Sequence, residues 1–572
     1  MFQAGWAKRN IGITPRGYAM QGYGMWHHRA EGEQSPLFAR AFFIADASGQ
    51  ALVFCCLDLG YVTHAMREGV CRQLRQEMGE AFHEEAFVLT CTHTHSGPGG
   101  CTQDALYNVV TPGFVPEHVE RIVAASTAAI LQAWRSVAPT EVSLQQGRFD
   151  DALQVAWNRS LRAYNRNPDV QPRREDETHL ALDRQMQVLA FRREGRLLAL
   201  LSLFGVHATC VGSGQKKHDG DNKGYAASHA EQELQARGSA DAVAIFAQAT
   251  AGDVSPHYHG PGQAARRRAL RGAAEYAYAR QNGQRQSEQA LYIAETSGTV
   301  LQGGIDAIFS YADFSRQQAD PAFAKGRHDA RTSEPCHGVA FFTGTPVDGP
   351  GMPKALGLLA ARLAKAVQKR RLENRKQDTA AAGYYQQLYA AQGPKAILLE
   401  AGRKEVLGQP LAALMLPDFA DPLVKELKRQ ARLGALRESA LVPSVLPLQI
   451  LRLGSLALVC APGEFTTTAG RRLRESVQAV LQQQGVAQVL LCTYCNEYMG
   501  YVTTFEEYQE QAYEGGHTVF GQWTLAAFQT LFGRLATELG KTPDERRHDR
   551  ETRPVPPPAA ELALRSNLPV PR

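Results

Sequence analysis

Two histidines that are two residues apart, His93 and His95, are the first side chains whose types and spacing could do chemistry. They follow the apolar run 87–91, and on an extended segment alternate side chains point to the same face. Together with His207 and Glu464, these imidazoles could form a His/His/carboxylate set for zinc. Zinc in such a site lowers the pKa of a bound water to about 7 and makes it a nucleophile. Because the chain contains 17 histidines, the simpler interpretation of this pair alone is two surface or hydrogen-bonding histidines.

Ser255 is the second candidate, in the segment Gly252-Asp-Val-Ser-Pro256 that follows the apolar run 242–247. A serine displayed on a sharp turn after a strand could be a nucleophile or a hydroxyl that orients the substrate. The segment is not the G-x-S-x-G nucleophile elbow. Taken alone, it is typical of an ordinary Asp/Ser/Pro turn.

The sequence also predicts a scaffold that would bring these distant residues together. Five apolar runs of strand length end at polar or glycine-containing segments, namely 87–91, 197–206, 243–246, 456–462 and 489–492. The segments that follow contain His93, His207, Ser255, Glu464 and Tyr501. Ligands of open α/β sheets bind beyond the carboxyl ends of strands, so these ends predict one convergent site.

Helical patterns alternate with the strand-like runs. Residues 116–134, 263–280 and 353–375 have apolar side chains at helical spacing. We therefore predict an α/β fold, a large layered mixed sheet with helices on both faces, over residues 1–540. Residues 403–440 are rich in Lys, Arg and Leu, which suggests an inserted helical element, either a lid over the site or a surface decoration. Residues 541–572 are charged and proline-rich, which predicts a tail that is extended or disordered at its end.

Composition excludes several classes of function. The net charge of +5, from 62 cations and 57 anions, is too weak to indicate nucleic-acid binding. No apolar run reaches 18 residues and no signal peptide is visible, so we expect no transmembrane segment and a cytoplasmic location, or secretion if a leader was removed. Ten cysteines in 572 residues are no disulfide framework and predict buried thiols. Metal or redox use of the single C-x-x-C, Cys492 to Cys495, is a minor alternative.

Several motifs occur in one order and resemble the neutral/alkaline, non-lysosomal ceramidase family. They are THTHSGPGG from Thr92, Asn158-Arg-Ser160, GDNKGYA from Gly220, GDVSP from Gly252, PGEFT from Pro462, GYVTT from Gly500 and YEGG from Tyr513. The likeness extends from about residue 8 to about residue 520. It implies one zinc ion and hydrolysis of the amide bond of N-acylsphingosine (ceramide), giving an amine base and a fatty acid.

The resemblance also implies roles for individual residues. It gives His93, His207, Glu464 and Tyr501 as Zn²⁺ ligands. It places His95 and Arg159 beside the metal, Ser255 as the essential serine, and Tyr513 facing the scissile carbonyl. Ser255 either attacks the substrate or orients it while a zinc-bound water attacks. We favour the water, because the sequence names no His or Lys partner for Ser255.

The chain departs from the family pattern at identifiable places. Thr250 and His257 stand where the family has asparagines beside the serine, which puts the contacts to the substrate headgroup in doubt. The 56 residues after Gly516 are too few for the C-terminal immunoglobulin-like β-sandwich of many members, so we expect none. Three alternatives stay open, namely an amidohydrolase for a non-sphingolipid N-acyl amine, an inactive lipid-binding relative and a plain serine hydrolase. Peripheral membrane contact is a further expectation, and the sequence does not indicate an oligomeric state.

Overall fold

The apolar runs of the sequence form the inner strands of two β-sheets. The computed structural model describes the chain except for residues 110, 112, 346, 350, 374–378, 416–421 and 567–572. The larger sheet has the order β11-β9-β8-β6-β1-β3-β4-β5, with the short β13 (Thr299–Val300) paired to β6. Its strands are β1 (Phe2–Asn10), β3 (Phe38–Ala45), β4 (Ala51–Leu57), β5 (Phe87–Cys91), β6 (Ala138–Arg148), β8 (Gln185–Arg193), β9 (Arg196–Leu203) and β11 (Val243–Ala247). Neighbours are antiparallel except at the two ends, where β4–β5 and β11–β9 are parallel.

The second sheet has four strands in the order β14-β19-β20-β22. They are β14 (Ile305–Asp313), β19 (Val445–Leu453), β20 (Leu456–Cys460) and β22 (Gln488–Cys492), and only β20 and β22 run parallel. Side chains from both sheets share one buried cluster, in which Phe42 and Phe191 of the larger sheet join Leu451 and Leu490 of the second. The two sheets therefore pack face to face.

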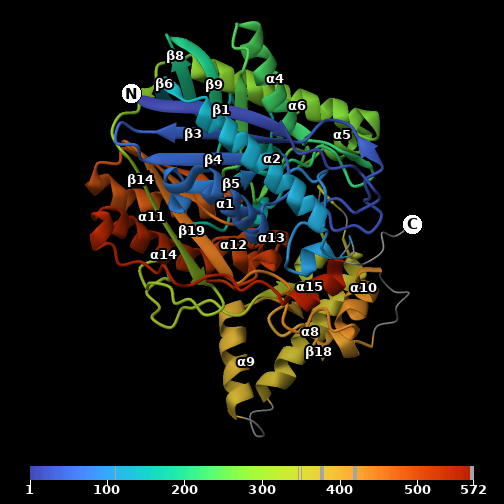
Figure 1. Ribbon diagram of the computed structural model, residues 1–572. Helices are drawn as coiled ribbons and strands as arrows, with labels where there is room; N and C mark the ends of the chain where they lie inside the picture. The colour runs from blue at the N-terminus through green and yellow to red at the C-terminus, as the bar shows by residue number, and fades with distance from the viewer. Residues whose placement is uncertain are drawn as a thin grey trace.

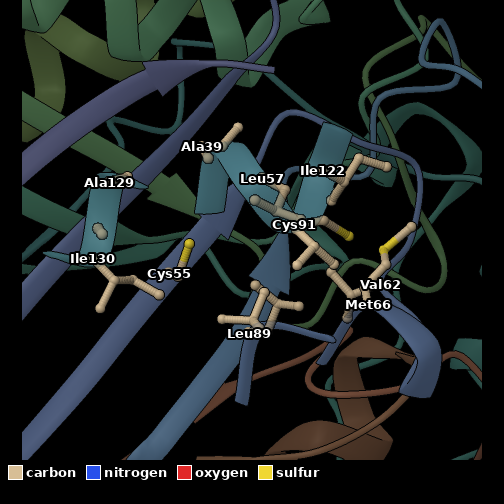
Figure 2. Packing of buried hydrophobic residues seen from close by; sticks show 14 of the residues in the cluster. Ala39, Cys55, Leu57, Val62, Met66, Leu89, Cys91, Ile122, Ala129 and Ile130 are labelled. Carbon is tan, nitrogen blue, oxygen red and sulfur yellow. The ribbon is translucent and has the colours of Figure 1, made fainter. Parts of the chain in front are cut away.

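Helices cover the outer face of each sheet, so the molecule has four layers, α/β/β/α (Figure 1). The larger sheet carries α1 (His64–Met78), α2 (Pro116–Arg135), α4 (Asp221–Ala236) and α6 (Ala273–Ala294), and the second carries α11 (Thr467–Leu481) and α14 (Thr524–Leu539). The larger sheet is apolar on both faces, as the alternation along β3 shows. Ala39, Ala41 and Phe43 face the helices, whereas Phe42 and Ile44 face the second sheet. Figure 2 shows the helix side of this packing, where Leu57 and Leu89 meet Met66 of α1 and Ile122 of α2.

The predicted fold class, an α/β layered fold with a large mixed sheet, is confirmed. Helices lie on both outer faces of the layered body, and two sheets rather than one lie between them. The predicted helix 116–134 is α2. The segment 263–280 is two helices, α5 (Ala264–Ala269) and α6, because Leu270 is extended and Gly272 has a φ of +58°. Strands β1, β3, β6 and β14 were not predicted, because polar residues interrupt their apolar runs.

Residues 403–440, expected to be helical, are helical only in part. They begin with a small hairpin of β17 (Glu405–Val406) and β18 (Gln409–Pro410), and α10 (Pro422–Arg432) is their single α-helix in the residues described. The hairpin extends a sheet with β15 (Cys336–Gly338) and β16 (Ile397–Glu400), beside α8 (Lys354–Glu373) and α9 (Thr379–Gln392). Basic and leucine-rich composition did not reveal the turn at Leu407–Gly408, where both residues have positive φ.

The tail expected at 541–572 is not extended throughout. It contains the helix α15 (Ala559–Ser566), and residues 567–572 lie outside the described range. Glu561 of α15 accepts hydrogen bonds from the backbone N–H groups of Glu438 and Ser439, both at 2.9 Å. The tail therefore packs against the end of the 403–440 segment. Among the helices described, none is long and apolar enough to cross a membrane.

Candidate metal centre and active site

The segments that follow β5, β9, β11, β20 and β22 meet in space, as the sequence suggested. Short pairings hold them together: Thr94 bridges to Ala208, and Glu464 pairs with Tyr501 between the parallel strands β21 (Glu464–Phe465) and β23 (Tyr501–Val502). Ser255 pairs with Trp157 between β12 (Val254–Ser255) and β7 (Trp157–Asn158). Residues from five distant parts of the chain thus surround one point.

His93 lies just beyond the end of β5, in a left-handed backbone conformation with φ of +67°. Its Nδ1 is hydrogen-bonded to the carbonyl of Gly60, which leaves Nε2 facing Glu464, with 3.4 Å between Nε2 and Oε1. Burial lowers the pKa of His93 to about 4, so the imidazole is neutral at pH 7. A neutral imidazole with a fixed tautomer is the form that binds a metal.

His207 is oriented in the same way from another segment. Its Nδ1 lies 2.7 Å from the carbonyl oxygen of Ala251 and 3.1 Å from that of Val254. Its Nε2 lies 2.9 Å from Oε2 of Glu464 and 3.2 Å from the hydroxyl of Tyr501. Both histidines therefore present Nε2 to one carboxylate.

Glu464 is the buried acid between these imidazoles. Burial alone would raise the pKa of Glu464, but the nearby His93 and His207 and the hydrogen bond from Tyr498 lower it well below its usual value. The hydroxyl of Tyr498 donates to Oε1 at 2.6 Å, and that of Tyr494 donates to Oε2 at 3.2 Å. The carboxylate is held ionised and oriented, as a metal ligand must be.

The donor set fits a metal ion. The ring nitrogens of His93, His95 and His207 lie within 4.8 Å of one another, and Nε2 of His95 is 3.1 Å from Nε2 of His93. Both His93 and His207 have a backbone carbonyl on Nδ1, the outer partner that metal-binding histidines usually have. The predicted ligands His93, His207, Glu464 and Tyr501 are thus brought together with His95 beside them, and the role of each remains a prediction.

Arg159 lies next to this group, at the end of β7, with its guanidinium buried. It forms ion pairs with Asp348 at 2.7 Å and Glu514 at 2.9 Å. Its remaining N–H groups donate to the hydroxyl of Tyr501 at 3.0 Å and to the carbonyl of Gly252 at 2.8 Å. Arg159 therefore links Tyr501 to the loop that carries Ser255.

Asp348 is a site residue that the sequence analysis missed. The hydroxyl of Ser255 donates to Oδ1 of Asp348 at 2.6 Å, and the backbone N–H of His257 donates to the serine oxygen at 3.0 Å. Burial would raise the pKa of Asp348, but Arg159 lowers it below the usual range. Within the described residues, no histidine or lysine side chain hydrogen-bonds to Ser255 Oγ. Asp348 lies in a Gly- and Pro-containing loop with no recognisable motif, so no sequence signal pointed to it.

Tyr513 begins α13 (Tyr513–His517) on the other side of Arg159. The guanidinium carbon lies 5.6 Å from the centre of the Tyr513 ring, which itself lies 5.4 Å from the ring of Tyr501. Burial raises the pKa of Tyr513 above its usual value, so its hydroxyl stays protonated. In the part of the chain described, this hydroxyl donates to no other protein group and is free to bond to a substrate.

The structure also shows the surroundings of the cysteines and of His257. All ten cysteines are free and buried, as predicted, and burial raises the pKa of both Cys492 and Cys495, which makes these thiols unreactive. The imidazole of His257 bonds through Nε2 to the carbonyl of Thr209 at 2.6 Å. At this departure from the family pattern, the backbone N–H of His257 donates to Ser255, and the His257 ring bonds elsewhere.

Comparisons with known proteins show the family of the chain. The family described as neutral/alkaline non-lysosomal ceramidase, N-terminal, matches residues 2–413 and 430–530. The chain is 31% identical to the neutral ceramidase of Pseudomonas aeruginosa over 546 residues, which is 94% of this chain and 72% of that protein. It is 32% identical to the neutral ceramidase of Mycobacterium tuberculosis, over 95% of this chain and 77% of that one.

Solved structures give the same result. A structure described as ceramidase complexed with C2 aligns with a TM-score of 0.76 at 31% identity, over 94% of this chain and 75% of that one. The crystal structure of the Pseudomonas aeruginosa neutral ceramidase aligns with a TM-score of 0.76 at 28% identity, over 98% of this chain and 77% of that one. The family match leaves out residues 414–429, inside the segment 403–440. From the family match, the similar sequences and the shared fold, the chain belongs to the neutral/alkaline non-lysosomal ceramidase family.

Proposed function

We propose that the protein is a zinc-dependent amidohydrolase that cleaves the amide bond of N-acylsphingosine or a related N-acyl lipid. The observation that carries the proposal is the meeting of His93, His207, Glu464 and Tyr501 beside Arg159 and Ser255. The relatives with matching sequences are named neutral ceramidases. A zinc ion in this site would polarise the amide carbonyl and acidify a water molecule.

The protein groups around the metal site supply the other requirements of amide hydrolysis. Tyr513 has a protonated hydroxyl that can donate to the developing oxyanion, an interaction worth about 3 kcal/mol per donor in other hydrolases. His95 is neutral, because burial lowers its pKa well below the usual value, so its ring can hold the attacking water or the leaving amine by a hydrogen bond. Arg159 fixes the position of the Tyr501 oxygen by donating to it.

The surroundings of Ser255 favour orientation of the substrate over direct attack. Its only side-chain acceptor in the described residues is Asp348, whose pKa Arg159 and the nearby histidines lower against the effect of burial. A carboxylate with a depressed pKa is a weak general base, since an efficient base has a pKa near the working pH. We therefore assign to Ser255 a hydrogen bond to the hydroxyl or amide of the substrate.

Activity measurements with metal analysis test the proposal. Wild type, Ser255→Ala and His93→Ala are assayed on N-acylsphingosines and on N-acyl amino acids, with zinc content determined for each. We expect stoichiometric zinc in wild type and Ser255→Ala, loss of zinc in His93→Ala, and hydrolysis of N-acylsphingosine by wild type. An acyl group trapped on Ser255 after rapid quenching would refute the assigned role of this serine.

A second substrate class is favoured by one observation. Thr250 and His257 replace the two asparagines that the family has beside the serine, and the side chain of His257 bonds to Thr209. Fewer amide groups near Ser255 would weaken recognition of the sphingosine headgroup and suit a simpler N-acyl amine. Turnover of N-acyl amino acids alone in the same assay would establish this alternative.

A further inference from the structure

Helix α8 exposes an unusual concentration of leucine side chains. Leu356, Leu358, Leu359 and Leu363 are 54, 67, 54 and 46% exposed. They are four of the twelve large apolar side chains that are exposed in the described part of the chain. Single exposed leucines are ordinary, but a contiguous apolar group marks a site of interaction.

Three of these leucines form an exposed stripe along one side of the helix. Leu356, Leu359 and Leu363 follow the spacing i, i+3, i+7 and so share one side of the helix. The buried residues of α8, Gly357 and Ala364, lie on a neighbouring side, each about 100° round the helix from Leu356 and Leu363. A Cβ atom at Gly357 would lie 2.7 Å from the side chain of Thr343, so glycine permits the close packing that fixes this orientation.

Cations lie beside the leucine stripe. Helix α8 has six Lys and Arg residues and one carboxylate, at its last residue. Arg371 pairs with Glu400 and Glu405, whereas Lys354, Arg362 and Arg370 form no ion pair with the described residues. An apolar stripe flanked by unpaired cations is the pattern of helices that lie in the interface of an anionic bilayer.

The helix is also adjacent to the proposed active site. It follows α7 (Val339–Phe342), where the ring of Phe341 stacks 5.7 Å from that of Tyr513. Lys354, at the start of α8, comes six positions after Asp348, the partner of Ser255, a span of at most about 22 Å. Figure 1 shows α8 and α9 together at the lower end of the molecule, where they project from the layered body.

We propose that α8 docks the protein on an anionic lipid bilayer, with Leu356, Leu359 and Leu363 in the hydrocarbon boundary and Arg362 and Arg370 at the headgroups. The inference rests on the proposed function, since an N-acyl lipid has to be taken from a membrane. The apolar stripe supplies insertion, and the cations select negatively charged surfaces. A docked α8 would place the wall formed by Phe341 and Tyr513 close to the membrane surface.

Vesicle binding of the full chain tests the docking surface without any assay of activity. Cosedimentation is measured with vesicles of phosphatidylcholine alone and of phosphatidylcholine mixed with phosphatidylserine. Wild type binds the mixed vesicles more tightly, and added salt weakens the binding. The triple variant Leu356→Ser/Leu359→Ser/Leu363→Ser and the double variant Arg362→Glu/Arg370→Glu each lower the partition coefficient by about tenfold or more.

Matched controls on other faces separate α8 from general surface effects. Tyr292→Ser/Val300→Ser removes exposed apolar side chains elsewhere, and Arg72→Glu/Arg121→Glu reverses exposed charges on α1 and α2. Both controls are expected to bind like wild type. Equal binding by the leucine variant and wild type, or no binding of wild type to either vesicle, would overturn the proposal. A concentration-dependent dimer that the leucine substitutions dissociate would assign the stripe to a second copy of this chain instead.

Activity distinguishes failure of docking from failure of the proposed function. The leucine variant should hydrolyse a short-chain, water-soluble N-acylsphingosine at the wild-type rate and lose at least about tenfold on a long-chain substrate held in vesicles. Equal loss on both substrates would show damage to the site and contradict a docking role. Vesicle binding without hydrolysis of either substrate would leave docking intact and refute the proposed activity.

Discussion

Asp348→Asn removes one negative charge from the buried network that joins Arg159 to Ser255. In the wild type, the two oxygens of Asp348 receive the guanidinium of Arg159 at 2.7 Å and the hydroxyl of Ser255 at 2.6 Å. The hydroxyl of Thr209 donates to the same carboxylate at 3.1 Å. Asparagine keeps the shape of the side chain, so the substitution tests the charge and its hydrogen bonds with little change in packing.

The expected magnitude follows from these contacts. A hydrogen bond to a charged group contributes about 1.5–3 kcal/mol. If the bond to Ser255 orients the serine in the transition state, its loss lowers kcat by about 10- to 150-fold. Breaking a buried ion pair lowers the free energy of unfolding by about 3–5 kcal/mol. Because Arg159 keeps Glu514 as a partner at 2.9 Å, we expect a value near the lower end of that range for Asp348→Asn.

The assay is a double-mutant cycle, in which kcat is measured for wild type, Ser255→Ala, Asp348→Asn and the double variant. If Asp348 acts through Ser255, the variant Ser255→Ala/Asp348→Asn has a kcat within about twofold of Ser255→Ala alone, because the second change has nothing left to remove. Zinc content should remain at the wild-type level, since no hydrogen bond or ion pair joins Asp348 to His93 or Glu464 in the described residues. An unchanged kcat in Asp348→Asn, or fully additive losses in the cycle, would refute the positioning role.

Three further predictions concern the site and its support. Gly22→Ala should lower kcat more than about tenfold, because a Cβ atom there would lie 2.3 Å from the ring of His95. The control is Gly24→Ala, since Gly24 has open space around it. Equal kinetics of the two variants would contradict the steric argument. Arg159→Lys should lower kcat about tenfold or more with KM less affected, because lysine cannot donate at once to Glu514, Asp348, Gly252 and Tyr501. Wild-type kinetics of this variant would refute the prediction. Burial lowers the pKa of Lys223 to about 7, so the unfolded chain binds more protons between about pH 7 and 10, and stability rises with pH in that window. Urea unfolding at pH 7.5 and 9 should therefore show a pH dependence that is smaller in Lys223→Met by up to about 1.4 kcal/mol per pH unit, and an identical dependence in both proteins would contradict the burial argument.

The sequence predicted the parts of the site that lie at the ends of strands. His93, His207 and Glu464 each follow a short apolar run with a clear end, and strand ends are where a layered α/β fold gathers its polar residues. The family motifs singled out the same residues, whereas the histidine spacing concerned only His93 and His95 and did not by itself identify a metal site. The sequence pattern and the structure agree for these three residues, because the end of each strand fixes where the following side chain lies.

Asp348 could not be predicted in the same way, because its position depends on tertiary contacts. It lies in a loop between α7 and α8, and its partners Arg159 and Ser255 are 189 and 93 residues away. The packing of two sheets could not be predicted from the sequence either. Strands such as β6 and β14 carry polar residues, and they are held in their sheets by pairing with more apolar strands. The hairpin at 405–410 was hidden by a composition that is typical of helices.

Zinc analysis combined with turnover of N-acylsphingosine tests the central claim most directly. We predict one zinc ion per chain, hydrolysis of N-acylsphingosine to free sphingosine and fatty acid, loss of turnover on chelation, and recovery when zinc is restored. Full turnover by protein stripped of metal, or stoichiometric zinc without cleavage of any N-acyl lipid, would contradict the account.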